Sequence, residues 1–168
     1  MRTARFCPQL LPNDARYIKD LETGFIWHRC SMRTLYADTD RADVVYHANY
    51  LRYFEFGRAS LLRDAAYPYK EIEKSGYVYP IIDLGITFFR PLHYDDPMFI
   101  HTRPAEMERI KLQFDYIITH AEAEIIICKG FTKHCALNSR GTPTAIDART
   151  RELWQVFPHK VEENEGIS

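Results

Sequence analysis

The residues of this chain that are best suited to chemistry lie together in residues 36–58. Three acids, Asp38, Asp40 and Asp43, precede His47, and a long apolar pattern with helical spacing follows at once. A carboxylate can attack a carbonyl carbon or activate a water, and free N–H groups at the start of a helix can hold a developing negative charge. An acid, a short spacer and a helix N-terminus therefore supply a group for nucleophilic attack or proton transfer and a place for a developing negative charge.

The elements around this segment follow a pattern of one strand, one long helix and then several strands. Residues 25–36 alternate between apolar and polar side chains, which predicts a half-buried strand, and residues 50–66 show one broad apolar face at helical spacing. Turn chemistry follows in residues 66–76, and residues 141–147 look like a turn that leads to a short last element. Four further segments have strand-like patterns and short connections: 79–89, 96–107, 111–119 and 123–138.

The connections between the strand candidates decide the fold class. Short connections force consecutive strands to be antiparallel neighbours. A single apolar helix cannot remain exposed, so the sheet must curl around it. The sequence therefore predicts an α+β fold in which an antiparallel sheet wraps around one long central helix. Gly130, within the last strand candidate, predicts a bulge or a close backbone approach.

The chain of 168 residues is most simply one domain. Residues 1–20 contain two prolines and mixed charge without a clear period, which predicts an arm or a partly ordered extension. The folded domain is expected to span residues 21–158, and residues 159–168 are expected to form a frayed acidic tail.

Charge and composition indicate which kinds of molecule this protein does not bind and where it is found. The 22 basic and 23 acidic residues nearly balance and are scattered, which argues against nucleic-acid binding. The four cysteines show neither paired nor zinc-site spacing, and a reducing cytoplasmic setting fits them. No apolar run approaches the ~20 residues that span a bilayer, and the first residues lack the apolar core of a signal peptide. We therefore expect a cytoplasmic protein with no metal site and no integral membrane segment.

The segment that begins at Asp38 resembles the signature of the hotdog-fold thioesterases, in the branch of 4-hydroxybenzoyl-CoA thioesterase and the YbgC-like acyl-CoA thioesterases. The resemblance covers about residues 25–150, with weaker similarity through "FFRPLHYDDPMFIHT". Where the family usually has a glycine, this chain has Asp43. The match runs through the following residues: Asp38, Asp40, Val44, Val45, Tyr46, His47, Asn49, Tyr50, Glu55 and Arg58.

The resemblance implies a hotdog fold and hydrolysis of an acyl- or aryl-thioester to a free acid and coenzyme A. It also implies that Asp40 is the catalytic carboxylate. We expect the backbone N–H of His47, rather than its imidazole, to polarise the thioester carbonyl, because this N–H lies just before the helix. Asp43 tolerates unusual backbone angles better than most residues, so the turn can survive without glycine, although a third carboxylate near the thioester bears on substrate choice or activity.

Several neighbouring residues have structural interpretations. Asp38 is expected to bond the N–H groups of its own loop, and Asn49 is expected to cap the helix. Glu55 and Arg58 are three residues apart on the helix, so they can form an ion pair. Arg58 lies within the apolar face and needs such a partner, in Glu55 or in a neighbouring subunit.

Other side chains are candidates for contact with the substrate. Aromatic residues around Tyr46 and Tyr50 suit an aryl or medium-length acyl group, and they serve equally as core. The candidates for holding the phosphates of coenzyme A lie at loops or strand ends: Arg90, Arg109, Lys111 and Lys133. The residues predicted to bind substrate are Tyr46, Asn49, Tyr50, Glu55, Arg58, Arg90 and Lys133.

Two alternatives to hydrolysis stay open from the sequence. Hotdog folds also host acyl-thioester hydratases and dehydratases, which transfer protons with a histidine and an acid, and Asp40 with His47 could serve that way. The unusual Asp43 also leaves room for a non-catalytic acyl-thioester-binding protein. No cofactor is expected, since coenzyme A is part of the substrate, and an acyl carrier protein is an equally open thiol carrier.

The resemblance further implies a homodimer or homotetramer with active sites between subunits, because two hotdog sheets commonly join edge to edge. The predicted sheet gives its own reason for the same expectation. Long exposed edges are usually paired or covered, and a two-fold axis would pair one edge of each subunit in a single contact.

Overall fold

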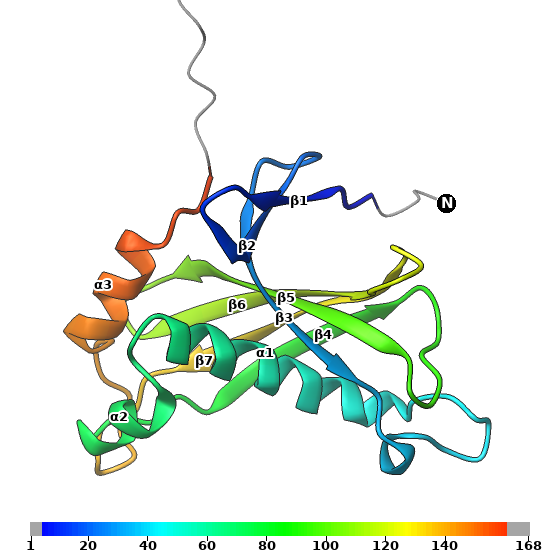
Figure 1. Ribbon diagram of the computed structural model, residues 1–168. Helices are drawn as coiled ribbons and strands as arrows, with labels where there is room; N and C mark the ends of the chain where they lie inside the picture. The colour runs from blue at the N-terminus through cyan, green and yellow to red at the C-terminus, as the bar shows by residue number, and fades with distance from the viewer. Residues whose placement is uncertain (1–4, 161–168) are drawn as a thin grey trace, which may run out of the picture.

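The longest helix, α1 (Tyr50–Asp64), lies across one face of a seven-stranded sheet (Figure 1). The computed structural model describes residues 5–160. The strand order is β1-β2-β3-β5-β6-β7-β4, and every neighbouring pair is antiparallel. This arrangement confirms the predicted antiparallel sheet around one long helix.

The strands that the alternating patterns predicted are present, with slightly shifted ends. The strand before α1 is β3 (Ile26–Arg33), which pairs with β5 in the middle of the sheet. The strands after α1 are β4 (Ile81–Phe88), β5 (Pro97–Met107), β6 (Lys111–His120) and β7 (Ile126–Cys135).

The N-terminal region contains regular structure that its sequence pattern did not predict. Strands β1 (Pro8–Leu11) and β2 (Asp14–Asp20) form a hairpin, and β2 extends the sheet by pairing with β3. Ile18 and Trp27 are buried in a small apolar cluster of their own, against which Phe6 packs. Residues 1–4 of the predicted extension and 161–168 of the predicted acidic tail lie outside the described residues.

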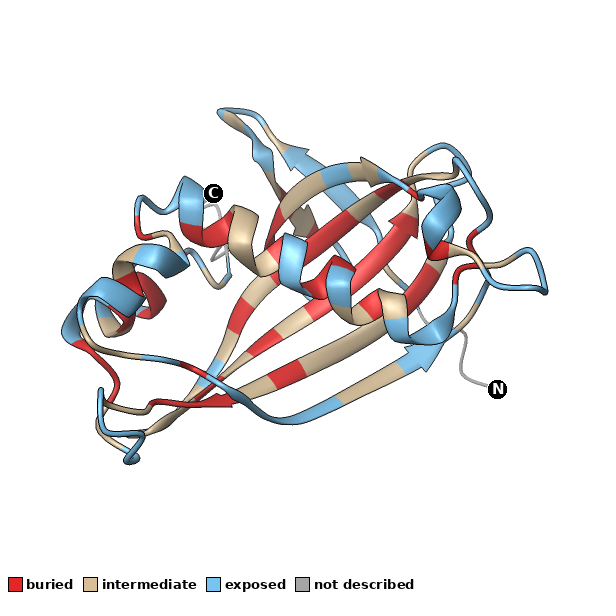
Figure 2. Ribbon diagram, turned by 90° about the horizontal axis from the view of Figure 1, so that it is seen from below, coloured by how far each residue is buried: buried red, intermediate tan, exposed pale blue. Residues whose placement is uncertain are grey.

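The main core lies between α1 and the sheet, where buried residues gather on the strands beneath the helix (Figure 2). Phe54 of α1 stacks on Tyr116 of β6, with ring centroids 4.2 Å apart and an interplanar angle of 5°. A Cβ at Gly130 would lie 2.7 Å from the Phe54 ring and 2.6 Å from the Gly85 carbonyl oxygen. The close approach predicted at Gly130 is therefore confirmed, because only glycine leaves room for this helix residue.

Two further helices gather at the end of the sheet where α1 ends (Figure 1). The short helix α2 (Tyr69–Lys74) forms where the sequence predicted only turn chemistry. The predicted short last element is the helix α3 (Ala148–Val156), and Asp147 caps it by accepting the Thr150 N–H at 2.9 Å. None of the helices within residues 5–160 has both the length and the apolar character that a membrane crossing needs.

Candidate active site

The predicted catalytic residues lie on a hairpin-like loop at the opposite end of α1 from α2 and α3 (Figure 1). Backbone hydrogen bonds hold the loop on both sides. The Asp40 N–H donates to the Val44 carbonyl oxygen at 2.9 Å, and the Tyr46 N–H donates to the Asp38 carbonyl oxygen at 2.9 Å. The Asp43 N–H closes the tip by donating to the Asp40 carbonyl oxygen at 3.0 Å. The loop is therefore a defined turn with a fixed path.

Asp43 occupies the backbone conformation that explains the usual glycine of this position. Its φ is 60°, in the left-handed region that glycine adopts without steric cost. Aspartate is enriched among the non-glycine residues found in this region. The turn thus survives the replacement, as predicted.

Asp38 is buried beneath the loop and acts as its hydrogen-bond hub. Its Oδ2 accepts the Leu35 N–H at 2.9 Å and the Tyr53 hydroxyl at 2.9 Å. Its Oδ1 lies 3.3 Å from the guanidinium of Arg52. These contacts tie the start of the loop to α1, which confirms the structural role predicted for Asp38. Burial and contact with this carboxylate also raise the pKa of Tyr53 far above its ordinary value.

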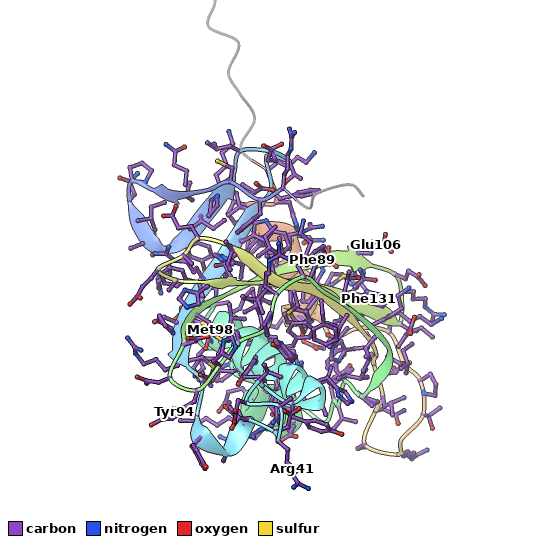
Figure 3. The ribbon with its side chains drawn as sticks, turned by 90° about the vertical axis from the view of Figure 1, so that its right-hand side faces the viewer. Arg41, Phe89, Tyr94, Met98, Glu106 and Phe131 are labelled. Carbon is purple, nitrogen blue, oxygen red and sulfur yellow. The ribbon has the colours of Figure 1, made fainter. Side chains whose placement is uncertain are left out.

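Asp40, by contrast, presents its carboxylate at the surface of the loop. Its Oδ1 accepts the Ala42 N–H at 2.8 Å, which fixes the side-chain direction. Its Oδ2 accepts no hydrogen bond from the described part of the chain. Arg41 projects outward from the tip of the same loop and away from the body of the molecule (Figure 3). One oriented carboxylate oxygen of Asp40 therefore stays available for a substrate or a water.

His47 is the first residue of a 3-10 helix (His47–Asn49) that leads into α1. Its backbone N–H makes no hydrogen bond to residues 5–160, as expected for the first N–H of a helix. Its imidazole is exposed and packs on the Tyr46 ring, with centroids 4.3 Å apart. The main-chain donor of His47 is therefore not used by the described residues.

A shallow cavity of about 290 Å³ adjoins His47, and we call it the loop cavity. It brings together three of the predicted site residues, His47, Tyr50 and Arg90. Tyr50 is buried and Arg90 is exposed. Burial raises the pKa of Tyr50 to about 12. The complete lining is Val45, His47, Tyr50, Phe88, Phe89, Arg90 and Pro91.

The cap predicted for Asn49 is wrong, and of the two partners expected for Arg58, Glu55 is not the one used. Asn49 does occupy the N-cap position, but its side chain makes no cap hydrogen bond. Its amide instead donates to the Asp38 carbonyl oxygen at 2.9 Å, so it fastens the loop. Glu55 and Arg58 form no ion pair within 4.0 Å in residues 5–160; Arg58 donates to the Tyr116 hydroxyl at 3.4 Å.

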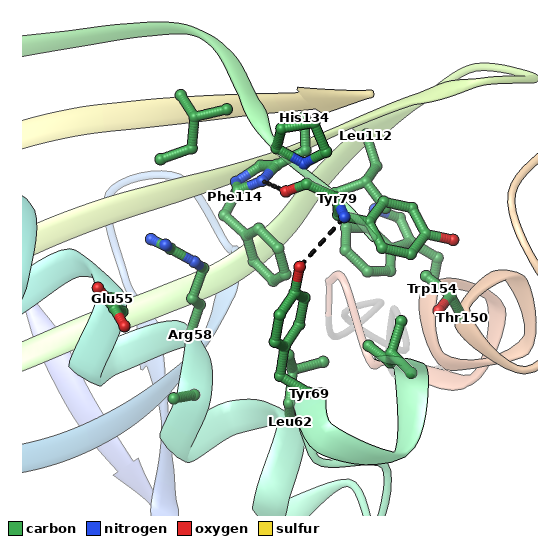
Figure 4. A pocket seen from close by; sticks show the side chains of 14 residues that line it. Glu55, Arg58, Leu62, Tyr69, Tyr79, Leu112, Phe114, His134, Thr150 and Trp154 are labelled. Atoms are coloured by element: carbon green, nitrogen blue, oxygen red, sulfur yellow. Dashed lines mark hydrogen bonds between the residues drawn. The ribbon is translucent and has the colours of Figure 1, made fainter. Parts of the chain in front are cut away.

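Glu55 and Arg58 line a second cavity, also of about 290 Å³, which we call the distal cavity (Figure 4). It lies between α1, the β4, β6 and β7 strands, α2 and α3. Lys133, Arg109 and Lys111 line neither of these two cavities. The structure therefore divides the predicted substrate-binding residues between two ends of the helix.

Five residues of the distal cavity carry polar groups that the sequence analysis missed. They are Tyr69 on α2, Tyr79 before β4, His134 on β7, and Thr150 and Trp154 on α3. Burial, together with a smaller effect of the nearby Arg58 charge, lowers the pKa of His134 to about 4. Nothing in the local sequence of these residues signals a site, because only the packing of distant elements brings them together. Residues 5–160 contain no group of three or more His, Cys, Asp or Glu side chains able to hold a metal ion.

Comparison with known proteins places the chain in a family. The model of the thioesterase-like superfamily matches residues 34–158, so the chain belongs to that family. YneP of Bacillus subtilis, named as a candidate acyl-CoA thioesterase, is 35% identical over 103 residues, covering 61% of this chain and 74% of YneP. The acyl-CoA thioester hydrolase YbgC of Escherichia coli is 28% identical over 98 residues, covering 58% of this chain and 73% of YbgC.

Solved structures agree with the family assignment. The crystal structure of a protein from Aquifex aeolicus has 29% sequence identity and a TM-score of 0.71, and the match covers 75% of this chain and 98% of that one. The family match, the named relatives and this fold together identify a thioester hydrolase with the hotdog fold. The predicted family, fold and enzyme class are confirmed.

Proposed function

We propose that this chain hydrolyses the thioester of an acyl- or aryl-CoA to a free acid and coenzyme A, with Asp40 as the catalytic carboxylate. One observation carries the proposal. The exposed Asp40 carboxylate belongs to the loop that leads into α1, and the His47 N–H, which makes no hydrogen bond to residues 5–160, directly follows that loop. Hydrolysis needs both kinds of group, and the names of YneP and YbgC point to the same reaction.

The carboxylate has two chemical routes to the same products. It takes a proton from a water that adds to the carbonyl carbon, or it adds to that carbon itself and water cleaves the resulting anhydride. In both routes the carbon–sulfur bond breaks, the thiolate leaves with the electron pair and takes up a proton, and one water is consumed. Coenzyme A enters as part of the substrate, and we propose no other cofactor.

The His47 N–H has the matching role at the carbonyl oxygen. A thioester oxygen gains negative charge as the carbon is attacked, and an N–H at a helix start stabilises that charge without reorganising. The exposed imidazole is not required for this role. Arg90, at the rim of the loop cavity, is suited to a phosphate of coenzyme A, because guanidinium groups pair with phosphate through two hydrogen bonds.

The active unit is proposed to be a dimer that pairs the β4 edges. β4 is the last strand of the sheet, and four of its apolar side chains are 40–49% exposed: Ile81, Ile82, Leu84 and Phe88. The other edge, β1, is only four residues long. A long apolar edge is the one that a protein must cover, so β4 is the favoured contact.

Antiparallel pairing of two β4 strands would also complete the site. Phe88 at one end of β4 lines the loop cavity, and Ile81 at the other end lines the distal cavity. A two-fold axis through the paired strands would place the loop cavity of one subunit beside the distal cavity of its partner. The thioester would then lie at the loop while its acyl group enters the neighbouring subunit.

The direct test is release of free thiol from a panel of acyl-CoA and aryl-CoA thioesters, with hydration of an enoyl-CoA measured in parallel. We expect thiol release from at least one thioester and no hydration. Hydration without thiol release would instead support proton transfer by Asp40 and His47. Binding without either reaction would support an acyl-binding protein.

Sedimentation tests the dimer. The wild-type protein should show no monomer at micromolar concentration, and Leu84→Lys on β4 should produce inactive monomer. Leu10→Lys is the matched control, because Leu10 is a 50% exposed leucine on the other edge of the sheet. A fully active monomer would contradict the shared site.

A further inference from the structure

The distal cavity has walls suited to an acyl group. Leu62, Leu112 and Phe114 supply apolar surface from α1 and β6. Trp154 of α3 packs against Phe114 at the cavity wall, with ring centroids 5.0 Å apart and an interplanar angle of 66°. The lining is thus mostly hydrophobic, with a few polar groups at defined places, which is the usual composition of a ligand site.

A chain of hydrogen bonds holds the one cation of this lining, Arg58, in place. Arg58 donates to the Tyr116 hydroxyl at 3.4 Å, and that hydroxyl lies 2.8 Å from Thr132 Oγ1. Thr132 Oγ1 lies 2.8 Å from His134 Nε2, and His134 Nδ1 lies 2.8 Å from the Tyr79 carbonyl oxygen.

The direction of this chain follows from the Tyr79 end and from the charge state of His134. The Tyr79 carbonyl oxygen can only accept, so His134 Nδ1 carries a proton. Because the pKa of His134 is lowered to about 4, the ring is neutral at neutral pH and its Nε2 accepts from the Thr132 hydroxyl. Thr132 Oγ1 then accepts from the Tyr116 hydroxyl, which in turn accepts from Arg58. The chain positions Arg58 but adds no negative charge to offset it.

The cavity therefore holds donors that nothing in the described residues uses. Arg58 engages one of its five N–H groups. The Tyr69 hydroxyl accepts the Tyr79 N–H at 3.2 Å, which leaves its own hydrogen free to donate. The indole N–H of Trp154 is buried without a hydrogen-bond partner. Against these donors the lining offers one carboxylate, Glu55, which is exposed and makes no ion pair within 4.0 Å in residues 5–160.

We propose that the distal cavity binds acyl groups that carry a carboxylate at their far end, with Arg58 as the residue that pairs with it. A plain alkyl chain would cover Arg58 and the Trp154 N–H without offering either an acceptor, and a buried donor without a partner is costly. A carboxylate supplies two acceptor oxygens in the geometry that a guanidinium fork matches. This inference rests on the proposed thioesterase function and names the substrate class of the same site.

Matched pairs of thioesters test this inference. Succinyl-, glutaryl- and adipyl-CoA should each be compared with the unsubstituted acyl-CoA of the same chain length. We expect one chain length at which the carboxylated member has the higher kcat/KM, by about 10-fold or more, as for a hydrogen bond to a charged group. Arg58→Met should remove that advantage by raising KM for the carboxylated member relative to the plain member of the same length. Equal losses for both members, or a preference for the plain chain at every length, would overturn the proposal.

Two further variants separate the ion pair from damage to the fold. Arg63→Met removes an exposed arginine of the same helix that lines neither cavity, so the preference should persist. Arg58→Lys keeps the charge but loses the fork, so it should retain part of the preference. Thermal unfolding of each variant shows whether the domain is intact.

Calorimetric titration keeps the two proposals distinguishable. Adipyl-CoA and hexanoyl-CoA should be titrated into the wild-type protein and Arg58→Met at a temperature where turnover is slow. If no thioester is hydrolysed, the proposed function fails, yet tighter binding of adipyl-CoA that depends on Arg58 would still support the cavity assignment. If thiol release occurs and adipyl-CoA binds no tighter than hexanoyl-CoA, only the cavity assignment fails.

Discussion

The two ends of α1 use a buried aspartate in the same way but differ in what they leave exposed. At the start of the helix, Asp38 accepts the Leu35 N–H and the Tyr53 hydroxyl, and the turn above it presents Asp40. At the far end, Asp147 accepts four hydrogen bonds, two of them from tyrosine hydroxyls. The next acid in the chain, the exposed Glu152, lies on α3 itself and not on a turn.

The difference distinguishes a carboxylate that stabilises the fold from one that is free to react. A carboxylate whose oxygens are filled by fixed donors stabilises the fold, whereas one with an unfilled oxygen can still act on a substrate. The loop end has both kinds, two residues apart in the chain. The predictions below test whether the two ends divide their tasks in this way.

His47→Pro should cause the largest loss at the loop end. Tyr46 has φ of −62° and ψ of 132°, the extended conformation that a residue before proline prefers, and the first position of a helix tolerates proline. The fold should survive while the N–H is lost, which should lower kcat by about 100-fold or more. His47→Ala keeps the N–H and should retain much of the activity. A dead but folded alanine variant would transfer the role to the imidazole.

Asp147→Ala should cause the largest loss of stability at the far end. It leaves the buried hydroxyls of Tyr67 and Tyr79 without an acceptor and removes the cap of α3. We expect the free energy of unfolding to fall by about 3 kcal/mol, measured by urea denaturation. Thr150→Val removes only the Thr150 hydroxyl from the same carboxylate, so it should cost less. Equal stability of Asp147→Ala and the wild type would show that the hydrogen bonds to Asp147 do not stabilise this end of the molecule.

Acid should weaken the far end through His134. Burial, with a contribution from Arg58, lowers the folded-state pKa of His134 to about 4, while an unfolded histidine titrates near 6.5. Between these values the unfolded chain binds a proton that the folded chain does not, so stability falls as pH falls from about 6.5 to about 4. Burial also lowers the pKa of His101 to about 3, so the loss of stability continues to lower pH. Melting curves should show a Tm that drops by about 5 °C or more across this window; a constant Tm would contradict the neutral histidine.

Asp43→Gly should have the smallest effect and the opposite sign. Glycine adopts a φ of 60° without steric cost, so the free energy of unfolding should rise by about 0.5–1 kcal/mol. Glu124→Gly is the control, because Glu124 has a φ of 53° in the turn between β6 and β7. It removes the same steric cost of a positive φ far from the site. A changed substrate preference in Asp43→Gly alone would show that the Asp43 carboxylate acts on the substrate.

The fold could be predicted from the sequence where local periodicity reports burial directly. The helix and the five strands from β3 to β7 have clear periods because one face of each packs on the core. The hairpin of β1 and β2 could not be predicted, because β1 is largely exposed and the large apolar residues of β2, Tyr17 and Ile18, are adjacent and so do not alternate with polar ones. The helix α2 is too short for its period to stand out from the turn residues around it.

The candidate site divides in the same way. Asp38, Asp40 and His47 could be predicted because they belong to one contiguous motif. The cap predicted for Asn49 was wrong and Glu55 is not the partner of Arg58, because both side chains bond to other segments: the Asp38 carbonyl oxygen and the Tyr116 hydroxyl. Such contacts depend on how β6 and the loop pack against α1, which spacing along one helix does not encode.

The most direct test of the account is the turnover of Asp40→Asn against that of Asp38→Asn on the best thioester substrate. Asparagine at position 40 keeps an oxygen for the Ala42 N–H but removes the charge, so the melting temperature should stay near the wild-type value. We predict a loss of at least ~100-fold in kcat for Asp40→Asn. Asp38→Asn should act mainly by lowering stability. Near wild-type kcat in a folded Asp40→Asn protein would show that Asp40 is not the catalytic carboxylate.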